Sequence, residues 1–142
     1  MALRTYPFLI TLAALLLAIG TGLGAIASHA LGATLDANAL HAFETAVDYQ
    51  LIHSVGLLAV AIFGMREAGS RLLLIAACLI AVGILLFCGG VYASSLDGPS
   101  LIARLAPTGG VALILGWGLV ATAVVLAATA KPERTKPERK RD

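Results

Sequence analysis

The sequence predicts an all-α membrane protein with four transmembrane helices in an antiparallel up-down bundle and both termini in the cytoplasm. Three observations lead to this prediction. Hydrophobic residues make up 59% of the 142 positions and charged residues only 13%, which is about half the charged fraction of a soluble domain. Four apolar segments are long enough to cross the ~30 Å hydrocarbon core of a bilayer, and short connections separate them. Basic residues gather on one side of this arrangement.

The first predicted span covers about residues 6–27 and follows Arg4. Its Ala-Ile-Ala ending at 25–27 is also typical of the small-residue cleavage site of a secretory signal. Because the apolar run is longer than the core of a typical signal, we favour a retained span. Gly20 and Gly24 form a GxxxG pair, which predicts the close approach of a neighbouring helix.

The second predicted span, 38–65, begins after Asp36, which we predict to be the N-cap of its helix. Depth in the membrane can be counted back from Arg66 at the opposite end. Asp48 precedes Arg66 by 18 residues, which corresponds to about 27 Å of helix, close to the thickness of the hydrocarbon core. Asp48 is therefore predicted near the outer boundary, with His53 roughly 8 Å further inside.

Polar side chains form a ridge on the outer half of this helix, between residues 40 and 54. One i,i+4 row consists of His41, Thr45, Tyr49 and His53, and a second row consists of Glu44 and Asp48. The beginning of the ridge is predicted to project beyond the apolar part of the bilayer. The groups that need partners within or beside it are then Tyr49, Gln50 and His53.

The third predicted span covers 72–96 and follows a short connection that carries two arginines. Gly89 and Gly90 either weaken this helix or let a neighbour pack closely. Tyr92 falls where an interfacial aromatic residue is expected. An Asp-Gly-Pro turn signal at 97–99 follows.

The fourth predicted span covers 107–130, after a short amphipathic turn at 100–106. Pro107 suits the first turn of its helix, and the free amide groups there can meet an anionic partner, either Asp48 or a ligand head group. Trp117 is too deep for an interfacial belt, so we assign it to packing or to a ligand contact. The glycines predicted at helix contacts along the chain are Gly20, Gly24, Gly89, Gly90, Gly109 and Gly110.

Residues 131–142 read KPERTKPERKRD and contain almost no apolar surface, so burial cannot offset the entropy cost of ordering them. We predict a disordered basic cytoplasmic tail after a four-helix domain that spans 1–130. This tail acts either as a topology anchor, which we favour, or as a surface for anionic lipids.

The distribution of basic residues sets the predicted orientation. With both termini inside, nine basic residues lie on the cytoplasmic side, namely Arg4, Arg66, Arg71 and the six in the tail. Arg104 alone lies outside, and the opposite orientation inverts this ratio. The pattern indicates a lipid bilayer as the partner of the chain and argues against a nucleic-acid surface.

Cys78 and Cys88 are the two cysteines and lie ten residues apart on one predicted helix. This spacing separates them by about 15 Å, well beyond the roughly 7 Å limit for a disulfide. We predict two buried thiols that serve packing.

The ridge admits three chemical interpretations. Nitrogen and oxygen ligands for zinc, iron or copper are available from the weak metal candidates His29, His41, Glu44 and His53, although the chain contains neither HExxH nor CxxC. A proton relay or a quinone-type site can use Asp48, Tyr49 and His53. The third interpretation, which we favour, is that the side chains hydrogen-bond one another and the neighbouring helix ends. The sequence does not identify a cofactor, which is therefore unknown.

Four segments occur in order along the chain: GAIASHAL at 24–31, FETAVDYQLIHSVGLL at 43–58, FCGGVYASSL at 87–96 and PTGGVALILGW at 107–117. Together they resemble the YgdD family of small inner-membrane proteins, which is classed under a domain of unknown function and has a related group in eukaryotes. The family's first motif reads closer to GAFGAHAL; here Ile26, Ala27 and Ser28 replace its Phe-Gly-Ala portion, and His29 is kept. The resemblance implies a four-helix fold in the bacterial inner membrane and supplies no established activity.

The resemblance also marks polar positions. With two residues added from the ridge, the predicted ligand-binding or polar cluster consists of His29, His41, Thr45, Asp48, Tyr49, Gln50, His53, Tyr92 and Thr108. We predict a non-enzymatic, multi-pass inner-membrane protein, N-in and C-in, whose outward-facing cluster locks the bundle or receives a small ligand or lipid head group. One alternative is an accessory subunit of a larger respiratory or photosynthetic membrane complex, or a homo-oligomer. The other is a metal or redox/quinone-linked membrane enzyme.

Overall fold

The computed structural model describes residues 2–67 and 70–129, and within them every regular element is a helix. The elements in chain order are α1 (Ala2–His29), the short 3-10 helix η1 (Leu31–Ala33), α2 (Ala37–Arg66), α3 (Arg71–Ser95), α4 (Ser100–Ala103) and α5 (Ala106–Thr129). Four helices are long and apolar enough to cross a membrane. The prediction of an all-helical chain with four potential spans is confirmed, while the predicted tail at 131–142 lies outside the described residues.

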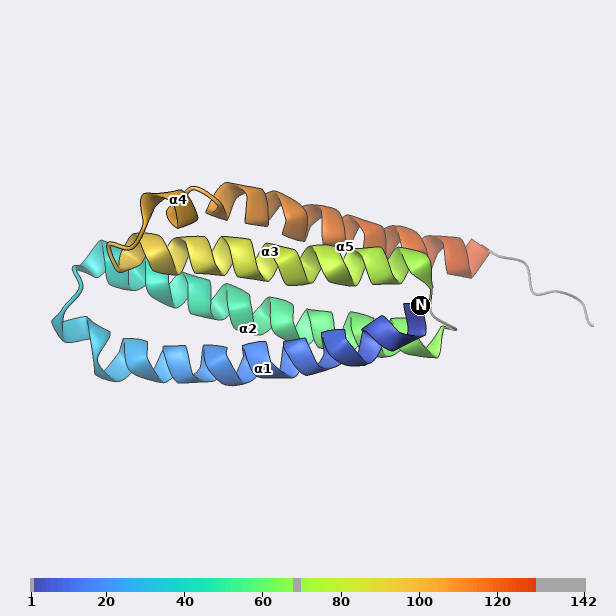
Figure 1. Ribbon diagram of the computed structural model, residues 1–142, viewed down its shortest axis with the longest axis horizontal. Coiled ribbons are helices and arrows are strands. Elements are labelled where there is room, and N and C mark those ends of the chain that lie inside the picture. The colour runs from blue at the N-terminus through green and yellow to red at the C-terminus, as the bar shows by residue number, and fades with distance from the viewer. Residues whose placement is uncertain (1, 68–69, 130–142) are drawn as a thin grey trace, which may run out of the picture.

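The long helices lie side by side in the order α1, α2, α3, α5 (Figure 1). The most extensive packing is between α3 and α5, followed by α1 with α2 and α2 with α3, while α1 touches α3 less. α1 ends and α2 begins at the same end of the molecule as α4, whereas α2 ends and α3 begins at the other end (Figure 1). α5 therefore lies at one edge of the row and packs mainly on α3.

A small cluster of buried apolar side chains, Ala27, Phe43 and Val47, lies between α1 and α2, while most of the others in α1, α2 and α3 form a larger core. Its members recur at three- and four-residue steps, the spacing of one helix face, and include Tyr6, Leu9, Ala13, Leu16, Ala46, Leu57, Ala61, Leu73, Ala77, Ile80 and Ile84. α5 differs, because only Gly109, Leu113 and Gly116 are buried on it. Most of its apolar surface faces outward, as expected for a helix in contact with lipid.

Glycines let α5 approach the backbone of α3. A Cβ atom at Gly109 would collide with the backbone nitrogen of Phe87, and one at Gly116 would lie 2.8 Å from Ile80 Cγ1. Such small residues are how apolar helices gain close contact in a membrane. Gly118, on the same helix, has no neighbouring atom within 4 Å of a Cβ position. The seam between α3 and α5 therefore depends on particular glycines.

The other glycines predicted at helix contacts fall into two groups. A Cβ atom would point at a neighbouring helix from Gly20, Gly24, Gly90 and Gly110. At Gly89 it would meet nothing within 4 Å, so no helix packs on that position. Gly64 was not singled out by the sequence pattern, yet a Cβ atom there would lie 2.6 Å from the ring of Tyr6.

Local features of the helix ends follow the sequence closely. Asp36 is the N-cap of α2, since its Oδ1 accepts hydrogen bonds from the backbone N–H groups of Asn38 and Ala39 at 2.8 and 2.9 Å. At the other end of the molecule, the Tyr6 hydroxyl donates to the carbonyl oxygen of Ser70 at 2.6 Å and ties α1 to the start of α3.

The two cysteines are both free. The prediction of a buried thiol is confirmed for Cys88, but it is wrong for Cys78, which is exposed. Ten residues along a helix fall about 80° short of three whole turns, so the two side chains leave α3 on different faces.

Candidate functional site

One turn of α2 presents polar side chains to two different spaces. Gln50 faces α1 and α3 and is buried, whereas the adjacent Tyr49 is exposed and His53 is half-buried on the side of α5. Successive residues on a helix point about 100° apart, which places neighbours of one motif on different faces. The polar ridge is thus divided into a closed side and an open side.

On the closed side, Gln50 links three helices. Its Nε2 donates to the backbone carbonyl oxygen of Leu16 on α1 at 2.8 Å, and its Oε1 accepts from the Tyr92 hydroxyl on α3 at 3.0 Å. Gly20 makes room for this amide, because a Cβ atom there would lie 3.2 Å from Nε2. Tyr92 is held in turn by Phe43, with ring centroids 4.7 Å apart. The amide is buried with both of its ends bonded, which avoids the cost of desolvating it.

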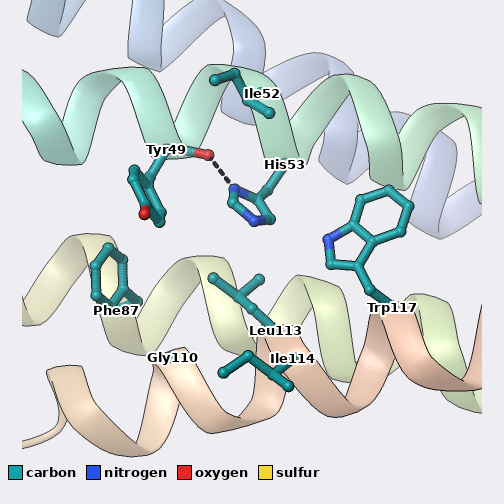
Figure 2. Close-up of a pocket in the computed structure, with 8 residues that line it drawn as sticks. All are labelled: Tyr49, Ile52, His53, Phe87, Gly110, Leu113, Ile114 and Trp117. Atoms are coloured by element: carbon teal, nitrogen blue, oxygen red, sulfur yellow. Dashed lines mark hydrogen bonds between the residues drawn. The ribbon is translucent and has the colours of Figure 1, made fainter.

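On the open side, a groove of about 590 Å³ runs between α2, α3 and α5 (Figure 2). Its lining residues are Tyr49, Ile52, His53, Phe87, Gly110, Leu113, Ile114 and Trp117. The volume lies within the range of small-molecule sites in proteins, which are mostly apolar with few polar groups. This groove is the candidate functional site.

Aromatic rings from three helices line the groove. The Tyr49 ring centroid lies 5.0 Å from that of Phe87 on α3 and 5.4 Å from that of His53. The His53 ring lies 6.3 Å from Trp117 on α5. The first two separations are typical of aromatic pairs that attract one another, and the third falls within the upper part of that range. Figure 2 shows the Tyr49 and His53 rings extending from α2, with the Phe87 ring facing Tyr49 from α3 and the Trp117 indole extending from α5, and these four rings are called the aromatic wall.

The hydrogen bond of His53 fixes which ring nitrogen carries the proton. Nδ1 lies 2.7 Å from the carbonyl oxygen of Tyr49, one turn earlier in α2 (Figure 2). Because a carbonyl oxygen can only accept, the tautomer that forms this bond carries its proton on Nδ1, and Nε2 of that tautomer is an acceptor. Within residues 2–67 and 70–129, no group bonds to Nε2. The site therefore presents an open acceptor at His53 Nε2, in a mostly apolar lining that also contains the Tyr49 hydroxyl and the Trp117 indole N–H.

Trp117 limits the groove at its inner end. A Cβ atom on Gly56 would lie 2.5 Å from the indole of Trp117, so the ring rests directly on the backbone of α2. Gly56 is three residues beyond His53, which is roughly 4.5 Å further along the helix. The predicted assignment of Trp117 to packing or to a ligand contact fits both features, since it packs on α2 and lines the groove.

The carboxylates of the ridge lie elsewhere. Glu44 and Asp48 line a separate space of about 270 Å³ between α2 and α1, together with Gly24 and Ser28. Asp48 is thus beside α1 and does not meet the N-terminal end of α5, contrary to one of the alternatives drawn from the sequence. Helical geometry accounts for this, because the second i,i+4 row is rotated from the first.

The remaining predicted polar residues do not join the groove. His29, His41 and Thr108 are exposed, and the Thr45 hydroxyl donates to the carbonyl oxygen of His41 at 2.8 Å within its own helix. No three His, Cys, Asp or Glu side chains in the described parts of the chain come together as metal ligands. The four weak metal candidates are therefore not assembled into one site.

Several residues of the site were not selected from the sequence. Phe87 begins one of the four matched segments but carries no polar group, and Leu113 and Ile114 are ordinary members of an apolar span. Gly56 had a usable signal, since it follows His53 by three residues and therefore lies on the same helix face. Only a map of which helix lies against α2 identifies Trp117 as its partner.

Comparison with known proteins assigns the sequence to a family. The family described as "Protein of unknown function (DUF423)" matches residues 23–110, a range that contains the whole α2 turn and Phe87, while Trp117 lies beyond it. No solved structure matches the chain.

Several proteins with similar sequences are described as membrane proteins. UPF0382 membrane protein YwdK of Bacillus subtilis (strain 168) is 33% identical over 107 residues, which cover 75% of this chain and 87% of the relative. A UPF0382 membrane protein of Haemophilus influenzae is 37% identical over 95 residues, covering 67% and 75%. UPF0382 inner membrane protein YgdD of Escherichia coli (strain K12) is 30% identical over 116 residues, covering 82% and 88%. The predicted resemblance is confirmed, and the chain belongs to the DUF423 family of membrane proteins of unknown function.

Proposed function

We propose that this protein is a non-enzymatic, multi-pass inner-membrane protein whose groove between α2, α3 and α5 receives a small lipid-soluble ligand. The observation that carries the proposal is the open acceptor nitrogen of His53 inside an aromatic, mostly apolar groove. A polar atom left open in such a place costs free energy unless a partner reaches it. A bound molecule is such a partner.

The proposed orientation is N-in and C-in, with the four spans running in alternating directions. Arg4, Arg66 and Arg71 then lie inside and Arg104 outside. This is consistent with the ends of the helices in Figure 1, where α2 ends and α3 begins opposite α4. The groove then occupies the outer half of the membrane, because Tyr49 precedes Arg66 by 17 residues, about 25 Å of helix.

The division of the ridge supports a ligand site over a purely structural role for Tyr49 and His53. Gln50 and Tyr92 already connect α1, α2 and α3. The hydrogen bond of His53 stays within α2 and connects no other helix. The open side therefore adds no polar link between helices, and its polar atoms are available to a bound molecule.

A filled-groove variant tests this proposal. Gly110 lines the groove, and a Cβ atom there would meet Phe87 only at an ordinary contact of 3.7 Å, so Gly110→Leu places a side chain in the groove without a backbone clash. Gly118→Leu is the matched control on the same helix, where the Cβ position is open.

Parent and variants would be extracted from native membranes into nanodiscs, and their small lipid-soluble molecules identified by mass spectrometry. We expect one compound to be retained in stoichiometric amount by the parent and by Gly118→Leu, and to be depleted in Gly110→Leu. Equal contents in all three proteins would refute the proposal.

A further inference from the structure

We infer that the ligand of this groove is a neutral, flat ring bearing a hydroxyl group, of phenol or hydroquinone type, whose O–H is donated to Nε2 of His53. This inference rests on the proposed function and deepens it by naming the chemical class of the ligand. It concerns binding alone, with no bond made or broken.

The hydroxyl follows from the protonation of His53. Its Nδ1–H is committed to the carbonyl oxygen of Tyr49 at 2.7 Å, so the neutral ring offers only a lone pair to the groove. At Nε2 a ligand carbonyl oxygen would place acceptor against acceptor, and the donors that could meet such an oxygen, the Tyr49 hydroxyl and the Trp117 N–H, belong to other side chains of the lining. A ligand that presents an O–H group satisfies Nε2 directly, and a hydroxyl group is not charged in the apolar surroundings.

The flat ring follows from the aromatic wall. Tyr49 lies 5.0 Å from Phe87 and 5.4 Å from His53, centroid to centroid, with interplanar angles of 35° and 25°. Faces and edges at these angles suit offset or tilted contacts with one more ring. A flexible acyl chain can bury apolar area against these rings, but it cannot form the offset or tilted ring contacts that they favour. A sugar would need several polar partners, and the groove lining provides few.

The absence of charge follows from the position of the carboxylates. An aromatic wall alone also attracts quaternary ammonium groups. Glu44 and Asp48, however, line the separate space beside α1 and do not line the groove. A cation would enter a mostly apolar site with no described counter-ion in its lining, at a high desolvation cost.

The length of the groove accommodates one small ring system, and its volume of about 590 Å³ leaves room for substituents on that ring. Trp117 closes its inner end on Gly56, and Gly110 lies seven residues before Trp117 on α5. This corresponds to about 10 Å of helix, the length of one or two fused rings with their substituents.

The single tryptophan of the chain makes the inference measurable. Trp117 lines the groove and is the only tryptophan among the 142 residues, so heavy-atom quenching of its fluorescence reports on this site. The probes are 4-bromophenol, 4-bromoanisole, which replaces the O–H by O–CH₃, and 4-bromophenyl-trimethylammonium. Each would be titrated into the full-length protein in phosphatidylcholine nanodiscs, with concentrations corrected for partition into protein-free vesicles.

We expect 4-bromophenol to quench Trp117 saturably, at a concentration at least tenfold lower than either of the other probes needs. His53→Phe keeps a ring and removes Nε2, so it should raise the half-saturating concentration of 4-bromophenol to that of 4-bromoanisole. His41→Phe is the matched control at an exposed position outside the groove and should leave the tenfold preference unchanged.

Other results separate this inference from the proposed function. Equal saturation by bromophenol and bromoanisole, abolished for both by Gly110→Leu, would overturn the hydroxyl recognition and leave the groove as a ligand site. Tighter binding of the ammonium probe would overturn the neutral ligand in the same way. Quenching that rises linearly with the concentration of every probe and is unchanged in Gly110→Leu would overturn both the proposed ligand class and the proposed binding site. The comparison of probes in the parent protein needs no variant, so poor folding of His53→Phe leaves the test decisive.

Discussion

The two sides of one α2 turn handle polar groups in opposite ways. Gln50 is 3% exposed, and both ends of its amide are bonded to neighbouring helices. Tyr49, the preceding residue, is 43% exposed, and His53 uses only one ring nitrogen within the described chain. The difference shows that a ridge of polar residues in a membrane helix is not one functional unit, because each face of the helix packs against a different neighbouring helix.

The contrast has a physical cause in the spacing of the helices. α1 approaches α2 closely where Gly20 lies against Gln50, so a polar group there must be bonded or pay for its desolvation. α5 packs mainly on α3 and reaches α2 through Trp117. The groove is the space between α2 and α5 on the Tyr49 side of this contact, where polar atoms remain accessible to a ligand.

The largest expected effect comes from a substitution that disrupts the open side, between α3 and α5, and leaves the Gln50 hydrogen bonds of the closed side unchanged. Gly109→Val should cost about 3 kcal/mol of unfolding free energy, because its side chain collides with the backbone of Phe87 and pushes α5 from α3. Unfolding in mixed detergent micelles, followed by helical circular dichroism, measures the loss, and Trp117 emission should shift toward that of an exposed indole.

Gly118→Val is the matched control, since its Cβ position is open. It should stay within about 0.5 kcal/mol of the parent. Equal losses in the two variants would mean that general helix propensity, and not the α3–α5 seam, sets the result.

The second effect breaks the closed side alone. Gln50→Leu should cost about 2 kcal/mol, since it leaves the Tyr92 hydroxyl without its partner in an apolar core. Tyr92→Phe should cost less, and the double variant should cost at least about 0.5 kcal/mol less than the sum, because the second change removes the group orphaned by the first. Additive costs in the cycle would disprove a direct link between these two side chains. Trp117 emission should not move.

The sequence predicted the helices better than the contacts between them. Long apolar segments and the Asp36 cap depend on local chemistry, and both agree with the structure. Burial on α3 depends on which of its faces contact other helices. Because α3 is apolar on all faces, its sequence does not indicate which face is buried, and Cys78 was therefore wrongly predicted to be buried.

The candidate site was predicted in part. Tyr49, Gln50 and His53 were selected as groups that need partners, but their division between two spaces depends on where α1 and α5 lie. Phe87 has no polar atom to draw attention. Asp48 illustrates the same limit, because an i,i+4 row fixes its position relative to the ridge and not relative to a neighbouring helix.

A third, smaller effect opens the inner end of the groove. Gly56→Ala puts a methyl group where the Trp117 ring rests, and should cost about 1 kcal/mol because a side chain can move more readily than a backbone. Trp117 emission should change while the Gln50 link stays intact. Gly89→Ala is the control, with open space around its Cβ position. An unchanged Trp117 spectrum in Gly56→Ala would show that the indole does not rest on α2.

The smallest expected effect on stability sharpens the comparison most. Tyr49→Phe combined with His53→Phe should change the unfolding free energy by less than about 0.5 kcal/mol in ligand-free detergent, because both variants keep an aromatic ring and neither native side chain holds another helix by a hydrogen bond within the described chain. The same double variant should lose the lipid-soluble compound that the parent retains, and with it the thermal stabilisation that a bound ligand gives. A cost comparable to that of Gln50→Leu in the absence of ligand would mean that both sides of the turn are structural. A small cost together with loss of the compound assigns stability to Gln50 and binding to its neighbours.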